Sequence, residues 1–186
     1  VYRYSLKNCD ADFFASELSF SASGVHFTLQ TPLGEEPVYL PLLGEFNVAN
    51  ALAALAANWD DFDDKTALIK ALQLLRGAPG RMQQIYIENQ PLVVVDYSHT
   101  PDALIVALQA LHQHTKGRLF CVYGCGGDRD KGKRALMTNA ALKYADMAYL
   151  TSDNPRTELP ANIMSDAIEG VDKVESSLTE SVLFMI

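Results

Sequence analysis

The chain has few cysteines, no long apolar run and no surplus of positive charge. Its three cysteines are Cys9, Cys121 and Cys125. An odd number without C-x-x-C spacing argues against a disulfide framework and against a zinc site, and it fits a reducing cytoplasm. No apolar run approaches membrane-spanning length, and residues 1–4 do not resemble a signal peptide. We therefore expect no membrane partner.

The formal net charge of the 186 residues is -8. This charge gives no general attraction to nucleic acid, so an anionic ligand must be bound by locally placed cations. The sequence has no G-x-x-x-x-G-K-[ST] phosphate loop, internal repeat or low-complexity segment. A hydrophobic content of 48% is ample for a globular core. The totals predict one globular domain or two small ones.

The first part of the chain predicts a small antiparallel sheet followed by two helices. Turn residues separate strand-like stretches at residues 1–7, 17–23, 24–30 and 37–43. An alanine-rich helix is expected from Phe46, and a second over residues 65–75. Glycine and proline between Arg76 and Arg81 end the second helix, so we predict one domain over residues 1–78 and another over residues 79–186.

The second part alternates between strands and helices, which predicts an α/β fold. Met82–Glu88 and Pro91–Asp96 indicate a hairpin. The later elements are expected as helices at 101–112, 133–144 and 161–169, and as strands at 118–123 and 147–151. Strands separated by helices of this length imply a mostly parallel sheet with right-handed crossovers. The apolar ending at residues 182–186 leads us to expect that the chain stops inside a domain.

A charged, glycine-rich loop follows the predicted strand Leu119–Tyr123. It reads GCGGDRDKGKR over Gly124–Arg134, and the next strand is followed by Ser152–Arg156. In open α/β sheets, ligands bind beyond the carboxyl ends of the strands. Two neighbouring strands would then direct Arg129 and Arg156 to one crevice. Guanidinium groups there suit a ligand with carboxylates, because arginine binds them bidentately and stays charged.

Simpler roles are open for several residues of these loops. Arg156 could form a structural salt bridge to Asp153 or Asp128. Lys131, Lys133 and Arg134 could belong to a solvated helix start. No histidine partner for Cys125 is visible in the sequence, so we interpret it as a small residue that fits the turn.

Polar residues upstream could bind a nucleotide or could cap helices. In DYSHTPD, Pro101 is predicted as the first residue of a helix and Thr100 as its N-cap, and a helix N-terminus offers N–H groups to a phosphate. Plain capping explains this pattern equally well. Asn47 and Asn50 lie three apart on one helix face and match the edge of adenine, although Asn47 could also be a cap. Arg81 by itself reads as an ordinary surface arginine.

The strings DYSHTPDAL, GCGGDRDKGKR and DNPRTE, in that order between Asp96 and Glu158, together resemble the C-terminal domain of the Mur ligases. The resemblance is strongest to the branch of the family that adds meso-diaminopimelate, and it extends more weakly back to Leu40. It implies a Rossmann-like C-terminal domain, truncated here, preceded by the end of a central ATPase domain. It also implies an ATP- and Mg²⁺-dependent amide ligase of cytoplasmic peptidoglycan precursor synthesis. Such an enzyme adds meso-diaminopimelate to UDP-N-acetylmuramoyl-L-alanyl-D-glutamate through an acyl phosphate.

The resemblance also implies roles for particular residues. Lysine-adding relatives lack an arginine at the position of Arg156, so this residue is expected to set the specificity for diaminopimelate. The expected diaminopimelate-binding residues are Arg129, Asp153, Asn154, Pro155 and Arg156. The expected ATP-binding residues are Asn50, Arg81, Asp96 and His99.

In the Mur ligases, the phosphate loop and the modified lysine that helps to hold magnesium lie upstream of the segment that this chain resembles. We therefore expect no catalytic residue and no metal ligand in this chain, which should be inactive alone. We expect a monomer whose partners are small molecules. The alternatives are another ligase of the superfamily, of the lysine-adding or folylpolyglutamate type, and a non-catalytic module that binds an amino acid or an anion.

Overall fold

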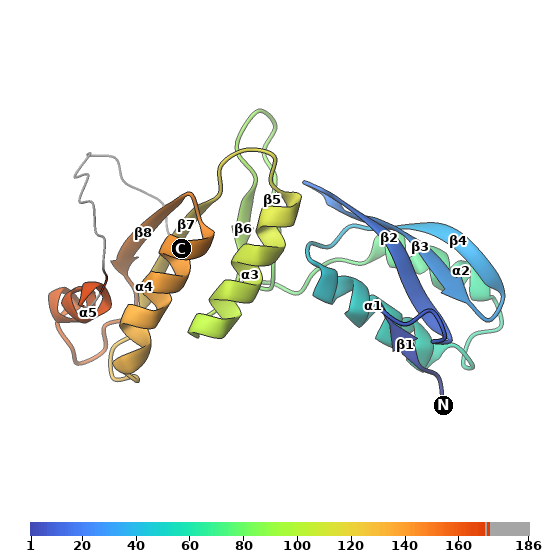
Figure 1. Ribbon diagram of the computed structural model, residues 1–186, viewed down its shortest axis with the longest axis horizontal. Coiled ribbons are helices and arrows are strands. Elements are labelled where there is room, and N and C mark those ends of the chain that lie inside the picture. Colours follow the sequence, from blue (N-terminus) through green and yellow to red (C-terminus); the bar gives the residue numbers. More distant parts are fainter. Residues whose placement is uncertain (170, 172–186) are drawn as a thin grey trace. The chain divides into compact units, whose positions relative to one another are not determined.

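The computed structural model describes residues 1–169 and residue 171, and the predicted apolar ending at 182–186 lies outside them. The chain forms two compact units (Figure 1). The first unit comprises Val1–Tyr97 and Ala110–Lys116, and the second comprises Ser98–Gln109 and the residues from Gly117 onward. The predicted boundary between residues 78 and 79 stays a prediction. No helix in the described part is both long and apolar enough to cross a membrane.

The order of strands and helices along the chain is close to the predicted order. The first unit contains β1 (Tyr4–Ser5), β2 (Phe13–Ser21), β3 (Gly24–Thr31), β4 (Gly34–Leu40), α1 (Glu45–Asn58), α2 (Lys65–Ala71), the 3-10 helix η1 (Leu72–Leu74), β5 (Gln83–Ile85) and β6 (Val93–Val95). Helix α3 (Pro101–His114) contributes residues to both units, and β7 (Phe120–Cys125), α4 (Gly132–Tyr144), β8 (Met147–Ser152) and α5 (Pro160–Ile168) belong to the second. The mixed α/β prediction is confirmed.

The first sheet has the order β1-β2-β3-β4 and is antiparallel except at one edge. Strand β1 pairs in parallel with β2, so the small antiparallel sheet that the sequence predicts has one parallel edge. The strand predicted over residues 1–7 shrinks to two residues. The hydroxyl of Ser5 accepts hydrogen bonds from the backbone N–H groups of Lys7 and Asn8, and this turn competes with strand pairing.

Strand β2 begins earlier than the predicted stretch at residues 17–23, and it contains a bulge that changes which side chains face the core. Phe13 and Ala15 are buried, whereas after the bulge Leu18 and Phe20 are the residues that pack against the core. The pairing with β3 shifts register between Ser16 and Ser19. A strict alternation over the whole segment therefore does not exist, since one extra residue reverses the facing of every residue beyond it.

Helix α1 packs against β1 and β2 and closes the core of the first unit (Figure 1). Its buried residues Val48, Ala51, Leu52 and Leu55 recur at the spacing of one helical face. Gly44 takes the N-cap position without a side-chain cap, so the suggestion that Asn47 caps this helix was wrong. The side-chain amide of Asn47 instead donates to the carbonyl of Leu43 at 2.7 Å.

The second unit combines a parallel strand pair with helices α4 and α5. Strands β7 and β8 pair in parallel, with Phe120 opposite Met147 and Cys125 opposite Ser152. Helix α4 packs against both β8 and α5. Because the register is continuous over six pairs, both strands end at the same edge. The predicted strand-to-loop repeat is confirmed.

His114, at the end of α3, is a buried imidazole with both ring nitrogens paired. The backbone N–H of Gly44 donates to Nε2 at 2.8 Å, so this nitrogen carries no proton. Nδ1 then donates to the carbonyl of Ser21 at 2.6 Å. Burial lowers the pKa of His114, because it disfavours the charged ring more strongly than the Ser21 carbonyl favours it.

We expect His114 to stabilise the fold only in its neutral form. A lowered folded pKa gives a contribution that is complete above the unfolded value of about 6.5 and is lost as the pH falls through the lowered one. NMR titration should place the midpoint of this ring below about 6.5. In His114→Gln, whose amide can both accept and donate, urea unfolding should lose this part of the pH dependence. An unchanged pH dependence in the variant would contradict the assignment.

Candidate functional site

The candidate site is formed by the two loops that follow β7 and β8. The first runs from Gly126 to Lys131 and the second from Asp153 to Leu159. The backbone N–H of Gly127 donates to the carbonyl of Asn154 at 2.9 Å, which ties the loops together directly. The structure therefore confirms that the segments carrying Arg129 and Arg156 are neighbours.

Glycine is required where the two loops touch. A β-carbon at Gly127 would lie 1.9 Å from the carbonyl oxygen of Pro155, a distance at which backbone atoms must move. A β-carbon at Gly124 would lie 2.9 Å from the carbonyl oxygen of Thr151. These glycines let one backbone pack directly on another.

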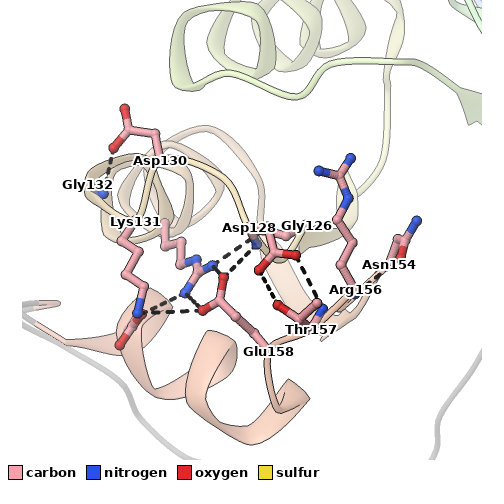
Figure 2. Close-up of polar contacts among 11 residues, drawn as sticks. Gly126, Asp128, Asp130, Lys131, Gly132, Asn154, Arg156, Thr157 and Glu158 are labelled. Carbon is pink, nitrogen blue, oxygen red and sulfur yellow. Dashed lines mark hydrogen bonds and ion pairs between the residues drawn. The ribbon is translucent and has the colours of Figure 1, made fainter.

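Asp128 links the loops through both its side chain and its backbone (Figure 2). Its carboxylate accepts hydrogen bonds from the hydroxyl of Thr157 at 2.7 Å and from the backbone N–H of Thr157 at 3.3 Å. Its own N–H donates to Oε1 of Glu158 at 2.6 Å. Asp128 and Arg156 adopt φ angles of 52° and 50°, a conformation that costs free energy in residues with a side chain. The bonds between the loops offset this cost.

Arg134 is the buried charge beneath the loops. The residue is only 1% exposed. Its Nη1 and Nη2 donate to the two carboxylate oxygens of Glu158 at 3.0 and 2.7 Å, and Nη1 also donates to Oδ2 of Asp166 at 2.6 Å. Nη2 further approaches the carbonyl of Gly126 at 3.4 Å. The buried guanidinium thus joins α4, α5 and both loops.

The ion pair affects the ionisation of both partners. The hydrogen bond from Arg134, followed by that from the Asp128 N–H, lowers the pKa of Glu158 to about 2. The hydrogen bonds from Glu158 and Asp166 raise the pKa of Arg134 against the effect of burial. Lys131 adds a second, exposed cation, 3.6 Å from Glu158 and 3.9 Å from Asp166. Glu158 is therefore charged at neutral pH.

The five residues expected to bind diaminopimelate all lie on these loops, but their contacts differ. Arg129 and Arg156 are exposed, and among the described residues neither forms an ion pair. The structural salt bridge considered for Arg156 is thus not formed with Asp153 or Asp128. Asn154 accepts a hydrogen bond from the backbone N–H of Arg156 at 3.3 Å. Figure 2 shows the side chain of Arg156 extending away from the buried ion pair.

Other contacts locate the remaining members of this set. The Cγ atom of Arg129 lies 3.8 Å from the position that a β-carbon on Gly126 would occupy. The first part of the Arg129 side chain is therefore close to the contact between the two loops. Asp153 and Pro155 line a small cavity with Cys125 and residues of α5. The arginines are not part of that lining, so the common crevice for the two guanidinium groups stays a prediction.

The residues expected to bind ATP are divided between the two units. In the first unit, Asn50 is exposed on α1 and its amide approaches Oδ1 of Asn47 at 3.4 Å. Arg81 lies over the ring of Tyr97, with 5.0 Å between its guanidinium carbon and the ring centroid. Asp96 accepts a hydrogen bond from the N–H of Met82 at 2.9 Å.

The remaining ATP-binding candidate, His99, is exposed in the second unit. It precedes Thr100, whose hydroxyl accepts from the N–H of Ala103 at 3.3 Å, as expected of an N-cap. Helix α3 begins at Pro101, as predicted. Cys125 is buried, and burial raises the pKa of its thiol, the opposite of what activates a nucleophile.

Sequence reasoning missed the buried ion pair. The role of Arg134 was left open, with a solvated helix start as one possibility that its burial now excludes, and neither Glu158 nor Asp166 was singled out. A signal does exist, because Arg134, Met137, Thr138 and Ala141 lie on one buried face of α4 at helical spacing. A cation at such a position is almost always paired. Its partners, however, lie 24 and 32 residues away in the sequence.

Known protein families account for most of the chain. The model of the Mur ligase glutamate ligase domain matches residues 80–183, and that of the Mur ligase middle domain matches residues 1–58. The first match alone covers more than half of the chain. The chain therefore belongs to the Mur ligase family, as the resemblance predicted.

Individual relatives agree with this assignment. The chain is 47% identical over 173 residues to the UDP-N-acetylmuramoyl-L-alanyl-D-glutamate–2,6-diaminopimelate ligase of Synechocystis sp., covering 92% of this chain and 34% of that protein. A solved structure of a ligase with the same name is 49% identical with a TM-score of 0.71, over 92% of this chain and 35% of that one. Mycobacterium tuberculosis folylpolyglutamate synthase complexed with ADP is 25% identical with a TM-score of 0.63, over 86% and 36%. The chain spans about a third of the length of these relatives.

We expect Gly127→Ala to destabilise the second unit, because the added methyl group meets a carbonyl that belongs to the opposite loop. Overpacking of this kind costs about 1–3 kcal/mol or more. Gly117→Ala is the matched control, since a β-carbon there has no neighbour within 4 Å. Thermal unfolding of both variants should show a lower midpoint for Gly127→Ala alone. Equal unfolding midpoints for the two variants would mean that the loops can move apart without loss of stability.

We also expect the stabilisation provided by Glu158 to depend on pH. Its folded pKa of about 2 lies below the unfolded value of about 4.3. Its contribution is therefore complete above the unfolded value and is lost as the pH falls through the folded one. The difference in unfolding free energy between the wild type and Glu158→Gln, from urea titrations, should shrink as the pH is lowered from about 5 to about 2. A constant difference would exclude the ion pair as its source.

Proposed function

We propose that the full-length protein is an ATP-dependent ligase that adds meso-diaminopimelate to UDP-N-acetylmuramoyl-L-alanyl-D-glutamate in peptidoglycan precursor synthesis. The observation that carries the proposal is the pair of exposed arginines, Arg129 and Arg156, on loops that are bonded to each other. Membership of the Mur ligase family and the names of the similar ligases support it.

The proposed role of the two loops is to bind diaminopimelate. This amino acid differs from lysine by a carboxylate at its far end, and a fixed cation is the group that best recognises that difference. Arg156 is the proposed specificity residue. Its guanidinium has no ionic partner among the described residues, so it keeps its donors for a ligand. Arg129, Asp153, Asn154 and Pro155 complete the proposed set.

The proposed nucleotide-binding residues have side chains that suit ATP. The exposed amide of Asn50 can both donate and accept at an adenine edge, and the carboxylate of Asp96 suits ribose hydroxyl groups. Arg81 and His99 are cationic or ionisable groups suited to phosphates. The described residues include no group of three or more His, Cys, Asp or Glu side chains that could hold a metal by themselves. The magnesium ion is proposed to be held by the rest of the full-length enzyme and by the phosphates of ATP.

The proposed chemistry activates a carboxylate that is otherwise a poor electrophile. The γ-carboxylate of the D-glutamate residue attacks the γ-phosphorus of ATP, ADP leaves, and the carboxylate becomes an acyl phosphate. The amine of diaminopimelate then attacks the acyl carbon, and the tetrahedral intermediate loses phosphate to form the amide. The loops of the second unit contribute by holding the diamino acid so that its neutral amine is in position to attack.

The remaining parts of the proposal concern the whole protein. Residues 1–78 are proposed to be the end of a central ATP-binding domain, and residues 79–186 a part of the C-terminal domain. The enzyme is proposed to act in the cytoplasm as a monomer on small-molecule substrates. The chain by itself is proposed to be inactive, because it carries no phosphate loop sequence.

The test compares diaminopimelate with lysine as substrates of the full-length protein. In the wild type, we expect phosphate release that depends on diaminopimelate and is at least about 100-fold slower with lysine, the loss expected when a buried or bound charge has no partner. Arg156→Ala should lose most of this preference, while Arg118→Ala, which removes an exposed arginine before β7, should keep it.

Two outcomes would overturn the proposed function. Equal use of lysine by the wild type would indicate a lysine-adding or other ligase of the superfamily. Binding of diaminopimelate in calorimetry without any phosphate release would indicate a non-catalytic binding module.

A further inference from the structure

We propose that Arg134 is a positioning residue for amino-acid recognition: its buried ion pair with Glu158 and Asp166 holds the loops of Arg129 and Arg156 in one arrangement. The inference rests on the proposed function, because it assumes that those two exposed arginines contact the substrate. Arg134 itself is buried and does not reach a substrate.

The first step is the contact between the loops themselves. Arg129 follows Asp128 directly, and Arg156 directly precedes Thr157. Asp128 and Thr157 are joined by two hydrogen bonds, at 2.7 and 3.3 Å. The backbone positions of the two exposed arginines are therefore fixed relative to each other by the pair of residues next to them.

The second step connects this contact to Arg134. Oε1 of Glu158 accepts from the N–H of Asp128 and from Nη2 of Arg134, at 2.6 and 2.7 Å. Glu158 is also the neighbour of Thr157 in sequence. The guanidinium thus orients the carboxylate that holds the backbone of Asp128, and Figure 2 shows these bonds as one connected network.

The third step is that only an arginine satisfies this arrangement. Glu158 is bound through both carboxylate oxygens while Asp166 is bound at the same time, so donors must point in fixed and different directions. A planar guanidinium does this, whereas the ammonium of lysine is a single point of charge. Without the buried guanidinium, the carboxylate of Glu158 would be more stable in contact with water. The loop that carries Glu158 would then move with it.

The experiment measures steady-state kinetics of the full-length ligase with meso-diaminopimelate, lysine and ATP. Arg134→Lys keeps the charge and loses the forked geometry. We expect KM for diaminopimelate to rise about tenfold and the preference over lysine to fall, because small displacements of binding groups have effects of this size. KM for ATP should stay within about twofold of the wild type.

Two further variants make the result specific. Lys143→Met removes an exposed charge from the last turn of α4 and should leave all constants unchanged. Glu158→Gln keeps the shape of the side chain and weakens the same bonds, and it should shift the same two quantities as Arg134→Lys. Should Arg134→Lys fail to fold, the kinetics of Glu158→Gln decide the question.

A purely structural role for Arg134 predicts a different pattern. Arg134→Lys and Glu158→Gln would then lower the thermal midpoint while KM for diaminopimelate and the preference over lysine stay at wild-type values, and this result would overturn the positioning role. Arg156→Ala separates this failure from failure of the proposed function. If Arg156→Ala loses the preference and Arg134→Lys keeps it, only the positioning role is wrong. If Arg156→Ala keeps the preference, the proposed specificity role of Arg156 is wrong, and if the wild type uses lysine equally well, the proposed function itself fails.

Discussion

The second unit depends on a buried guanidinium that shares two carboxylates. Burying one charge alone would cost several kcal/mol, so Arg134, Glu158 and Asp166 are acceptable in this place only as a set. That condition couples α4, α5 and the loop after β8, because each contributes one member. Gly127 completes the arrangement by letting the two loop backbones approach closely enough for the set to form.

The buried and the exposed arginines of this region differ in their contacts. Arg134 uses Nη1 and Nη2 on protein acceptors, whereas Arg129 and Arg156 have no ionic partner among the described residues. Binding groups are effective when the backbone that carries them is already ordered, since less entropy is then lost on binding. The positive φ angles of Asp128 and Arg156 show that this order has a cost in backbone conformation.

Much of the fold follows from local patterns. The helix α1, the strand β3 and the start of α3 at Pro101 were predicted because neighbours along the chain decide them. Strand β2 was misplaced because its bulge reverses the facing of its residues, and the pairing partner of β1 is not encoded in its own residues. A solvated place for Arg134, one of the roles that the sequence left open, is excluded for a related reason. A charged residue at a helix start is ordinarily exposed, and only distant carboxylates make its burial possible.

By itself, the sequence determined the alternation of strands and helices, the two charged loops and the family to which the chain belongs, because these reside in contiguous residues. The tertiary structure alone decided the register of β7 on β8, in which Cys125 lies opposite Ser152. It also decided that Asp128 bonds to Thr157 and that Glu158 and Asp166 enclose Arg134. These contacts join residues 24 to 32 positions apart. The pattern of α4 indicates that Arg134 faces the core, but it does not say which carboxylates pair with it. Whether the charge can be buried depends on the free energy of desolvation, and therefore on what packs around it.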